Sequence, residues 1–418
     1  MDVGQLAIHF IVTFLFALLF VIISAMILSY LDRKFQAFVQ DRWGPLHYGP
    51  QGIMQAMLDP MKLFLKEDVR AQATDSVVFR LAPMIFFAPV VTAFVVLPFS
   101  PYLTAGALGT GIILYVALSS IDVLGVFMAG WGSNNKYALI GGLRAAAQMI
   151  SYELPLVLSL VGVVLLTSVV APSCTLAARP DLSTCGVGSI SFTQIVAAQM
   201  LPQTPWLWFV LVQPLGLFIY YICGLAETNR SPFDLPEAES ELVAGYLTEY
   251  SGLRWALFFL GEYGNMTIVA AVATALFLGG WSFPGAAIGF WTTHFGAVAG
   301  QLIFNALATA VFIIKMYVLL LIFIWIRATL PRLRADQLMR FAWLFLIPLT
   351  LINILLTAGL LLLPFGLPWR LLLAGAANWL LLALVFATFR KVTGVSPTGK
   401  LPRWFRPAPM EAPQALDQ

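Results

Sequence analysis

The sequence predicts an all-α polytopic membrane protein, with eight core transmembrane helices, a ninth helix near the C-terminus and amphipathic interfacial helices on the cytoplasmic side. Two compositional observations carry this prediction: hydrophobic residues make up 60% of the chain and charged residues only 10%, and the mean hydropathy is +0.88. The third is the pattern, because several apolar runs exceed the ~20 residues that a helix needs to cross a bilayer. A transmembrane barrel would show alternating segments of about ten residues instead.

Nine apolar runs define the predicted spans. The first begins without a basic stretch or a small-residue cleavage site, so we expect it to be a retained span and not a signal peptide. The run 284–298 is too short to span, so we expect it to form a re-entrant or loop segment on the outer side. The nine spans are expected near residues 6–30, 78–100, 107–130, 148–171, 206–226, 255–281, 302–326, 340–363 and 367–389.

The distribution of basic residues orients these spans. With the N-terminus in the periplasm, nearly all of the 23 lysines and arginines fall on the cytoplasmic side, as the positive-inside rule requires. Arg179 and Arg370 fall outside, and Lys315 lies within a span. Nine spans then place the C-terminus in the cytoplasm. The chain divides into a membrane domain over 1–365, an extra transmembrane helix over 366–389 and a basic, proline-rich cytoplasmic tail over 390–418.

The chain has three cysteines and three scattered histidines. Three cysteines exclude an iron–sulfur cluster or a structural zinc site held by this chain alone, and the histidines argue against a haem or another metal centre, so we expect no metal site. Cys174 and Cys185 share one predicted outer loop, in a compartment that permits disulfides. A disulfide and two free thiols are both open alternatives there.

The first cytoplasmic loop combines cations with an amphipathic helix. Arg33 and Arg42 follow the first span. Apolar residues recur at helical spacing over 51–66, which is typical of a helix lying at the membrane interface. We expect Asp59, with the proline that follows it, to interrupt this helix and to face inward. The lysines of the segment are better explained as its solvated face.

Arg144 and Glu153 enter the membrane together at the predicted start of the fourth span. A carboxylate about a turn and a half inside a span is costly to ionise, so it must pair with a cation, face water or take up a proton. The alternative is a glutamate near the end of the span whose side chain reaches back to bulk water.

The segment 227–263 lies between two apolar spans and holds seven of the 20 acidic residues. Acids this close to lipid pair, line a watery cavity or bind protons, so the cluster predicts a proton path or a chamber for a charged ligand. The alternative is a polar loop outside the membrane. Glu237 and Glu241 are four residues apart, where like charges repel on a helix, so the pair could share a proton. The seven acids are Glu227, Asp234, Glu237, Glu239, Glu241, Glu249 and Glu262.

Further cations follow in the C-terminal half. Lys315 is isolated in the seventh predicted span, where a lysine is usually functional or paired with an acid. Arg327, Arg332 and Arg334 crowd the loop after that span. An arginine cluster opposite an acidic segment predicts fixed ion pairs, a docking surface for another subunit, or both.

Together, five of these segments resemble the quinone-chamber membrane subunit family of respiratory complex I, the proton-pumping NADH:quinone oxidoreductase. The resemblance implies eight core spans at the junction of the membrane arm and the hydrophilic arm. It also implies a tunnel that a quinone headgroup enters from the lipid, and an acidic, water-filled funnel leading to the proton channels of other membrane subunits. The segments are QDRWGP, LDPMKLFLKE, LRAAAQMISYELPL, ETNRSPFDLPEAESELVAGYLTEYSG and WIRATLPRLRADQLM.

The resemblance also implies roles for individual residues. The acids that it assigns to proton coupling are Glu153, Glu227, Glu237, Glu239, Glu241, Glu249 and Glu262. The residues that it assigns to the quinone chamber and its entrance are Asp59, Arg33, Arg42, Arg144, Arg230, Lys315 and Arg327. The chain departs from the family pattern at Asp32, where Glu is usual, and at Leu46, where Asn is usual. Its ninth span and tail also exceed the usual core.

The same resemblance implies that quinone is the substrate, that this chain alone binds no cofactor, and that no complete active site lies on it. Iron–sulfur clusters and flavin are expected on partner subunits. The expected partners are the other complex I subunits, membrane lipid and quinone, in the cell inner membrane, with no nucleic acid. Two other functions are considered: the equivalent subunit of a membrane-bound hydrogenase-type complex, and a stand-alone ion-coupled transporter. A transporter should show inverted repeats, whereas the acids here gather in one segment.

Overall fold

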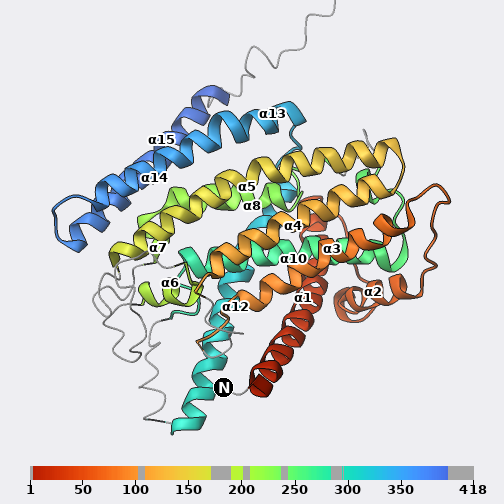
Figure 1. Cartoon of the computed structure of the whole chain (residues 1–418), viewed down its shortest axis with the longest axis horizontal. Helices are drawn as coiled ribbons and strands as arrows, with labels where there is room; N and C mark the ends of the chain where they lie inside the picture. Colours follow the sequence, from red (N-terminus) through yellow and green to blue (C-terminus); the bar gives the residue numbers. More distant parts are fainter. Residues whose placement is uncertain are drawn as a thin grey trace, which may run out of the picture.

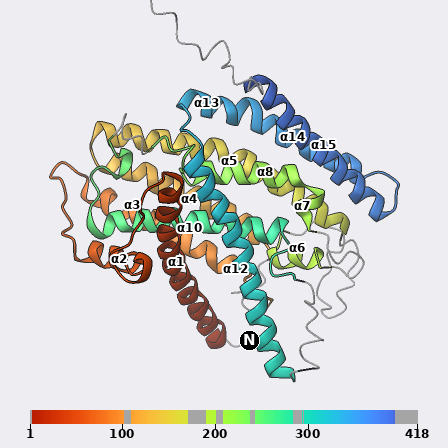
Figure 2. The same ribbon diagram turned by 180° about the vertical axis from the view of Figure 1, so that it is seen from behind.

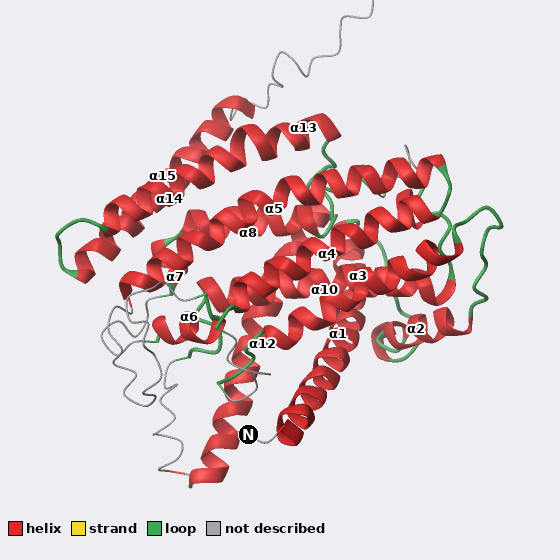
Figure 3. Ribbon diagram, viewed as in Figure 1, coloured by secondary structure: helices red, strands yellow, loops and turns green. Residues whose placement is uncertain are grey.

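The computed structural model describes residues 3–101, 109–170, 190–200, 208–236, 243–283, 294 and 296–393. Within these ranges the chain forms helices joined by turns and loops, without a strand (Figure 3). Eight of the described helical segments are long and apolar enough to cross a membrane, and a shorter apolar helix adds to them. Each predicted span overlaps one of these helices, so the prediction of an all-α polytopic membrane protein is confirmed.

Figure 1 labels the elements along the chain. The longer helices are α1 (Val3–Val39), α3 (Ser76–Val96), α4 (Gly111–Gly132), α5 (Lys136–Val170), α8 (Pro214–Glu227), α10 (Gly252–Phe277), α12 (Ala297–Thr329), α14 (Ile347–Leu361) and α15 (Leu367–Thr393). The shorter elements are η1 (Pro50–Gly52), α2 (Gln55–Leu65), α6 (Phe192–Ala198), α7 (Phe209–Val212), η2 (Gly245–Leu247), α13 (Ala335–Arg340) and the π-helix η3 (Phe341–Leu346). The elements α13, η3 and α14 follow one another without a break and form one apolar segment, Ala335–Leu361.

The body of the molecule is a set of helices that run in similar directions. α3 packs against α4, α4 against α5 and α5 against α8, and Figure 1 shows them side by side. α14 packs on α5, and α15 packs on α14 and α8 along one edge of this set. α1 and α12 cross the other helices at a steep angle, which Figure 2 shows from behind.

α10 is the central helix of the bundle. It packs against α1, α3, α8 and α12. In an apolar stretch of 18 residues, 72% of the residues of α10 are buried, compared with 28% in α1 and in α15. Polar side chains on α10 therefore reach neither lipid nor bulk water easily. They must find partners within the protein, because an unsatisfied polar group inside a membrane costs several kcal/mol.

Small residues allow the helices to approach one another closely. A Cβ at Gly125 of α4 would lie 2.8 Å from the backbone of Phe86 in α3. A Cβ at Gly142 of α5 would lie 3.2 Å from the Cα of Gly130 in α4. Close helix packing in membranes depends on such small residues, so these glycines hold α3, α4 and α5 together as one layer.

Two predicted helix boundaries were wrong. The fifth span was expected to be continuous over 206–226, but α7 and α8 are separated at Gln213, whose φ of −129° and ψ of 60° are not helical. Pro214 explains the break, because its ring and its missing N–H prevent α7 from continuing. The fourth span was expected to begin near residue 148, but α5 begins at Lys136. The glycines and alanines of its first turns pack closely on α4 and η2 and extend the helix.

The interfacial helix also differs from the prediction. α2 continues through Pro60 instead of stopping there. A proline inside a helix removes one backbone hydrogen bond, and this loss is smaller where water can reach the freed carbonyl. The apolar side of α2 is exposed as predicted, with Met57, Met61 and Phe64 each more than half exposed.

Some predictions fall outside the described residues. These are the candidate disulfide Cys174–Cys185, the acids Glu237, Glu239 and Glu241, most of the run 284–298, and the chain beyond residue 393.

Candidate functional site

One cluster of charges lies where α1, α10 and α12 meet. The Arg327 guanidinium of α12 pairs with the Asp32 carboxylate of α1. The Tyr263 hydroxyl of α10 donates to Asp32 Oδ2 at 3.1 Å, and Gln36 Nε2 donates to Oδ1 at 3.1 Å. Asp32 is buried, and charge-assisted hydrogen bonds of this kind offset the cost of burying it. Three helices distant in sequence are thus held together at one carboxylate.

A second buried pair joins this cluster through Tyr263. Arg230 Nη2 lies 3.5 Å from Glu262 Oε2, with the two side chains 8% and 9% exposed. The Tyr246 hydroxyl donates to Glu262 Oε1 at 3.0 Å. The guanidinium of Arg230 also lies 4.4 Å from the centre of the Tyr263 ring, a favourable cation–π distance. We call Asp32, Arg327, Tyr263, Arg230 and Glu262 the inner charge cluster.

The loop after α8 is fixed against the helices around this cluster. Gln148 Nε2 of α5 donates to the carbonyls of Ala226 and Phe233, at 2.8 Å and 2.5 Å. Arg332 Nη2 lies 2.9 Å from Asp234 Oδ2. One of the predicted arginines after α12 therefore does form an ion pair with the acidic segment.

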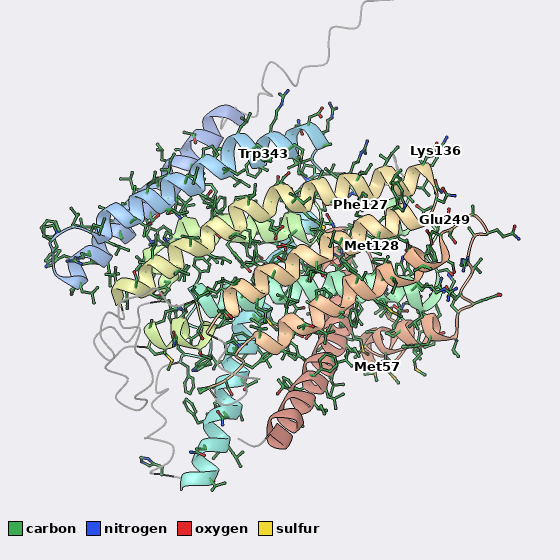
Figure 4. All side chains as sticks on the ribbon, in the orientation of Figure 1. Met57, Phe127, Met128, Lys136, Glu249 and Trp343 are labelled. Atoms are coloured by element: carbon green, nitrogen blue, oxygen red, sulfur yellow. The ribbon has the colours of Figure 1, made fainter. Side chains whose placement is uncertain are left out.

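The structure brings two of the remaining predicted chamber residues together. Arg33 Nη1 of α1 lies 2.5 Å from Asp59 Oδ2 of α2, and both side chains are partly exposed. This pair lies beside the exposed apolar side of α2, where Figure 4 labels Met57. Arg42 is exposed and donates to Gln40 Oε1 at 2.7 Å, apart from that pair. Arg144 lies half-buried on α5, one turn before Gln148.

Lys315 has a different environment from the other predicted cations. Its Nζ donates to three backbone carbonyls after the end of α10, those of Leu278 (2.8 Å), Gly280 (3.0 Å) and Ser282 (2.8 Å). The same ammonium lies 4.5 Å from the centre of the Trp208 ring. The structure therefore places Lys315 as a cap on the C-terminal end of α10, a position that favours a cation, and does not bring it together with the inner charge cluster.

Glu249 lies between η2 and α10 in the chain and contacts the turn that joins α4 to α5. Asn135 Nδ2 donates to Glu249 Oε1 at 2.9 Å, and Figure 4 labels Glu249 and Lys136, the first residue of α5, at the same end of the molecule. Burial raises the pKa of the neighbouring Tyr250 well above its ordinary value, so its hydroxyl keeps its proton and donates to the carbonyl of Phe79 at 3.3 Å.

A separate group of carboxyls lies within the membrane-spanning helices. Glu153 is near the middle of α5, half-buried, and accepts a hydrogen bond from the Ser120 hydroxyl of α4. Glu227 is the buried last residue of α8, interacts electrostatically with Glu153 and lies beside Ser119 of α4, whose hydroxyl donates to the Val116 carbonyl at 3.0 Å. Asp122 of α4 is 3% exposed and accepts from Asn265 Nδ2 of α10 at 2.9 Å. We call Glu153, Glu227 and Asp122 the interior acids.

The interior acids differ from the inner charge cluster in their partners. Among the described residues, none of the three takes part in an ion pair. Serine hydroxyls and an amide contact them instead. A carboxyl without a cation in such a place is costly when ionised, so it is suited to gaining and losing a proton.

Sequence reasoning missed Asp122 and the partners of Asp32. The signal for Asp122 was available, because a lone acid stood in an apolar run predicted to span the membrane. The contacts of Asp32 with Arg327 and Tyr263 join positions 295 and 231 residues apart, which no local pattern reveals. As for metals, no three His, Cys, Asp or Glu side chains in the described part of the chain come close enough to hold an ion.

Comparison with known proteins identifies the family. Residues 12–358 match the family model for NADH dehydrogenase. The H subunit of NADH-quinone oxidoreductase from Dehalococcoides mccartyi (strain CBDB1) is 41% identical over 388 residues, which cover 93% of this chain and 97% of the relative. The H subunits from Geobacillus kaustophilus and Anoxybacillus flavithermus are 46% and 45% identical over 78% of this chain and 86% of each relative. The chain therefore belongs to the NADH dehydrogenase family and, within it, to the H subunits, the membrane subunits of proton-pumping respiratory complex I.

Proposed function

We propose that this subunit forms part of a quinone tunnel with its partner subunits, and that its acids couple reduction of the quinone to proton movement in the membrane arm. The observation that carries the proposal is the separation of the two groups described above. Arg230 and Arg327 pair with acids in the inner charge cluster, whereas the interior acids lie in the spanning helices without an ion pair among the described residues.

The chemistry at the tunnel needs both kinds of group. A quinone that accepts two electrons from a neighbouring subunit becomes a dianion, and two protons convert it to the quinol. Cations such as Arg33 and Arg230 would stabilise the developing negative charge, and this interaction is strong where water is excluded. The protons come from nearby protein groups, and their removal changes the ionisation of the acids behind them.

The acids provide a route away from the tunnel. Glu262 lies in the inner charge cluster on α10. Glu227 lies at the end of α8 and Glu153 near the middle of α5. A change of charge at one carboxyl alters the proton affinity of the next, because like charges close together disfavour joint ionisation. Glu237, Glu239 and Glu241 are proposed to belong to the same route, together with Glu249.

The chamber residues are proposed in the same way. Asp59 with Arg33 would line the entrance beside α2, and Arg42, Arg144, Arg230 and Arg327 would hold charge around the headgroup. Lys315 was predicted to belong to this set, but its three carbonyl partners favour a structural role. The iron–sulfur clusters and the flavin would lie on partner subunits.

The remaining assignments concern the chain as a whole. We propose a quinone-chamber domain over 1–365, an added helix over 366–389 and a cytoplasmic tail over 390–418. The protein would lie in the cell inner membrane with its N-terminus in the periplasm and its C-terminus in the cytoplasm.

Replacement of Glu153 by Gln tests the coupling role. In assembled complex from membranes, we expect Glu153→Gln to lower NADH:quinone reductase turnover and proton pumping about tenfold or more, since loss of a proton-transfer group typically costs ~10²–10⁴-fold. Thr267→Val is the control, because Thr267 also lies in a spanning helix but is fully buried and donates to its own helix, to the Tyr263 carbonyl at 2.8 Å. Normal turnover and pumping in fully assembled Glu153→Gln complex would refute the coupling role.

A further inference from the structure

Asp122 is the interior acid that neither the sequence motifs nor the proposed function assigns. It lies on α4 and faces Asn265 of α10, which donates to its Oδ2 at 2.9 Å. Its other oxygen, Oδ1, is buried and accepts no hydrogen bond from the described residues. A buried carboxyl with one free oxygen is costly and needs an explanation.

Glu227 presents the same feature to the same place. Its Oε2 is buried and accepts no hydrogen bond from any residue that the structure describes. Asp122 and Glu227 both line one small cavity between α3, α4, α8 and α10, together with Tyr115, Ser119 and Asn265. The cavity is small, with room for about one water molecule.

The composition of the cavity wall limits the charge that it can hold. Among the residues that the structure describes, the wall carries two carboxyls and no lysine, arginine or histidine. Two ionised carboxylates facing one small cavity would repel each other strongly, and such pairs typically hold one proton between them. A water molecule between the two free oxygens would accept and donate the hydrogen bonds that both lack.

We propose that Asp122 and Glu227 bind one water molecule between them and exchange a proton through it, so that Asp122 extends the acid route from α8 to α4 and α10. The inference rests on the proposed function, because it gives the proton of Glu227 a second site. Ser119 would hold the Glu227 carboxyl from α4, and Asn265 would orient the Asp122 carboxyl. Proton transfer is balanced within the pair: the proton that leaves one carboxyl through the water arrives at the other.

A purely structural role for Asp122 makes a different prediction. Asp122→Asn keeps the size of the side chain and an oxygen that can accept from Asn265, but it cannot bind and release a proton. A structural role therefore predicts that Asp122→Asn has little effect. The proton-exchange role predicts a large loss of turnover and recovery of most of it in Asp122→Glu, which restores an acid.

The test measures NADH:quinone reductase turnover and proton pumping in assembled complex for Asp122→Asn, Asp122→Glu, Glu227→Gln, the double variant Asp122→Asn/Glu227→Gln and the control Thr267→Val. We expect Asp122→Asn and Glu227→Gln each to lose about tenfold or more. We expect the turnover of the double variant to be no lower than that of the less active single variant, because the effects of groups that act as a unit are not additive. Thr267→Val should match the wild type.

The outcomes separate this inference from the proposed function. If Asp122→Asn matches the wild type while Glu227→Gln is impaired, the exchange between the two acids is refuted and the coupling role of Glu227 stands. If both match the wild type, both proposals fail. A high-resolution map of the wild-type complex gives a test that needs no variant. Density for one water between Asp122 Oδ1 and Glu227 Oε2 supports the inference, and a well-resolved cavity without that density refutes the inference.

Discussion

The inner charge cluster and the interior acids are both buried carboxyl sites, but they are satisfied in opposite ways. Asp32 and Glu262 each have an arginine and a tyrosine hydroxyl. Asp122 and Glu227 have an amide or a hydroxyl and one free oxygen each among the described residues. An ion pair favours the charged form of an acid and fixes the helices that it joins, whereas an acid without one changes its protonation state more readily. The comparison therefore separates acids that also hold helices together from acids that do not.

The largest effect should follow from breaking a pair of the inner charge cluster. Arg230→Met leaves the Glu262 carboxylate buried without its ion pair, and removing one partner of a buried pair costs about 3–5 kcal/mol. We expect much less assembled complex in membranes, measured by native electrophoresis. Arg80→Met replaces an exposed arginine near the start of α3 and should assemble normally. Equal assembly of the two variants would mean that the buried pair does not hold the helices together.

Lys315 provides the next test, because it distinguishes a cap from a chamber cation. Lys315→Met leaves three carbonyls without their donor. We expect the free energy of unfolding of the complex, followed by thermal unfolding, to fall by roughly 2–3 kcal/mol, since hydrogen bonds to charged groups contribute about 1.5–3 kcal/mol each. Turnover per assembled complex should stay close to that of the wild type. A lower turnover with unchanged stability would return Lys315 to the quinone chamber.

A smaller effect should come from the hydroxyl that contacts an interior acid. Ser120→Ala removes the donor to Glu153, and we expect turnover to fall about three- to fivefold with normal assembly, which corresponds to ~1 kcal/mol for one partly exposed hydrogen bond. Ser159→Ala is the matched control, because Ser159 is buried in α5 and donates to its own helix, to the Leu156 carbonyl at 2.6 Å. If both serine variants lose turnover equally, the effect comes from packing and not from Glu153.

The smallest effect concerns α15, which lies beyond the region that matches the family model. Asn378 Nδ2 donates to the Val212 carbonyl at 3.2 Å, and Trp379 Nε1 donates to the Leu211 carbonyl at 3.1 Å. These two carbonyls lie at the break between α7 and α8. Asn378→Leu should lower stability by about 1 kcal/mol, the usual value of one hydrogen bond, and leave turnover unchanged in a thermal-shift and activity assay. Unchanged stability would show that α15 does not support the break.

Much of the fold followed from the sequence, because membrane helices are defined by long apolar runs and by loop charges. The polar contacts followed only in part, as in the ion pair of Arg332 with Asp234. Lys315 was expected to be functional or paired with an acid, but its ammonium donates to carbonyls of the turn after α10, and nothing in the residue types of that turn predicts where these carbonyls point. Glu153 was expected about a turn and a half inside its span, and it lies near the middle of α5 because that helix already begins at Lys136.

The candidate site was predictable in part. The motif segments identified the acidic segment and the arginines, and the names of the relatives favour the quinone oxidoreductase over the hydrogenase-type and transporter alternatives. Which acids are paired depends on contacts between distant helices, such as Asp32 with Arg327, so one sequence could not separate the inner charge cluster from the interior acids. Asp122 lay outside every motif, although a lone acid in an apolar run predicted to span the membrane could have identified it.

The central claim is that an unpaired interior acid changes its protonation when the quinone is reduced. Infrared difference spectra of the assembled complex, recorded between its oxidised-quinone and quinol states, measure this directly through the C=O stretch of protonated carboxyls. Wild-type complex should show a carboxyl difference band that Glu227→Gln loses and Thr267→Val keeps. Identical carboxyl bands in the wild type and in fully assembled Glu227→Gln would contradict the account.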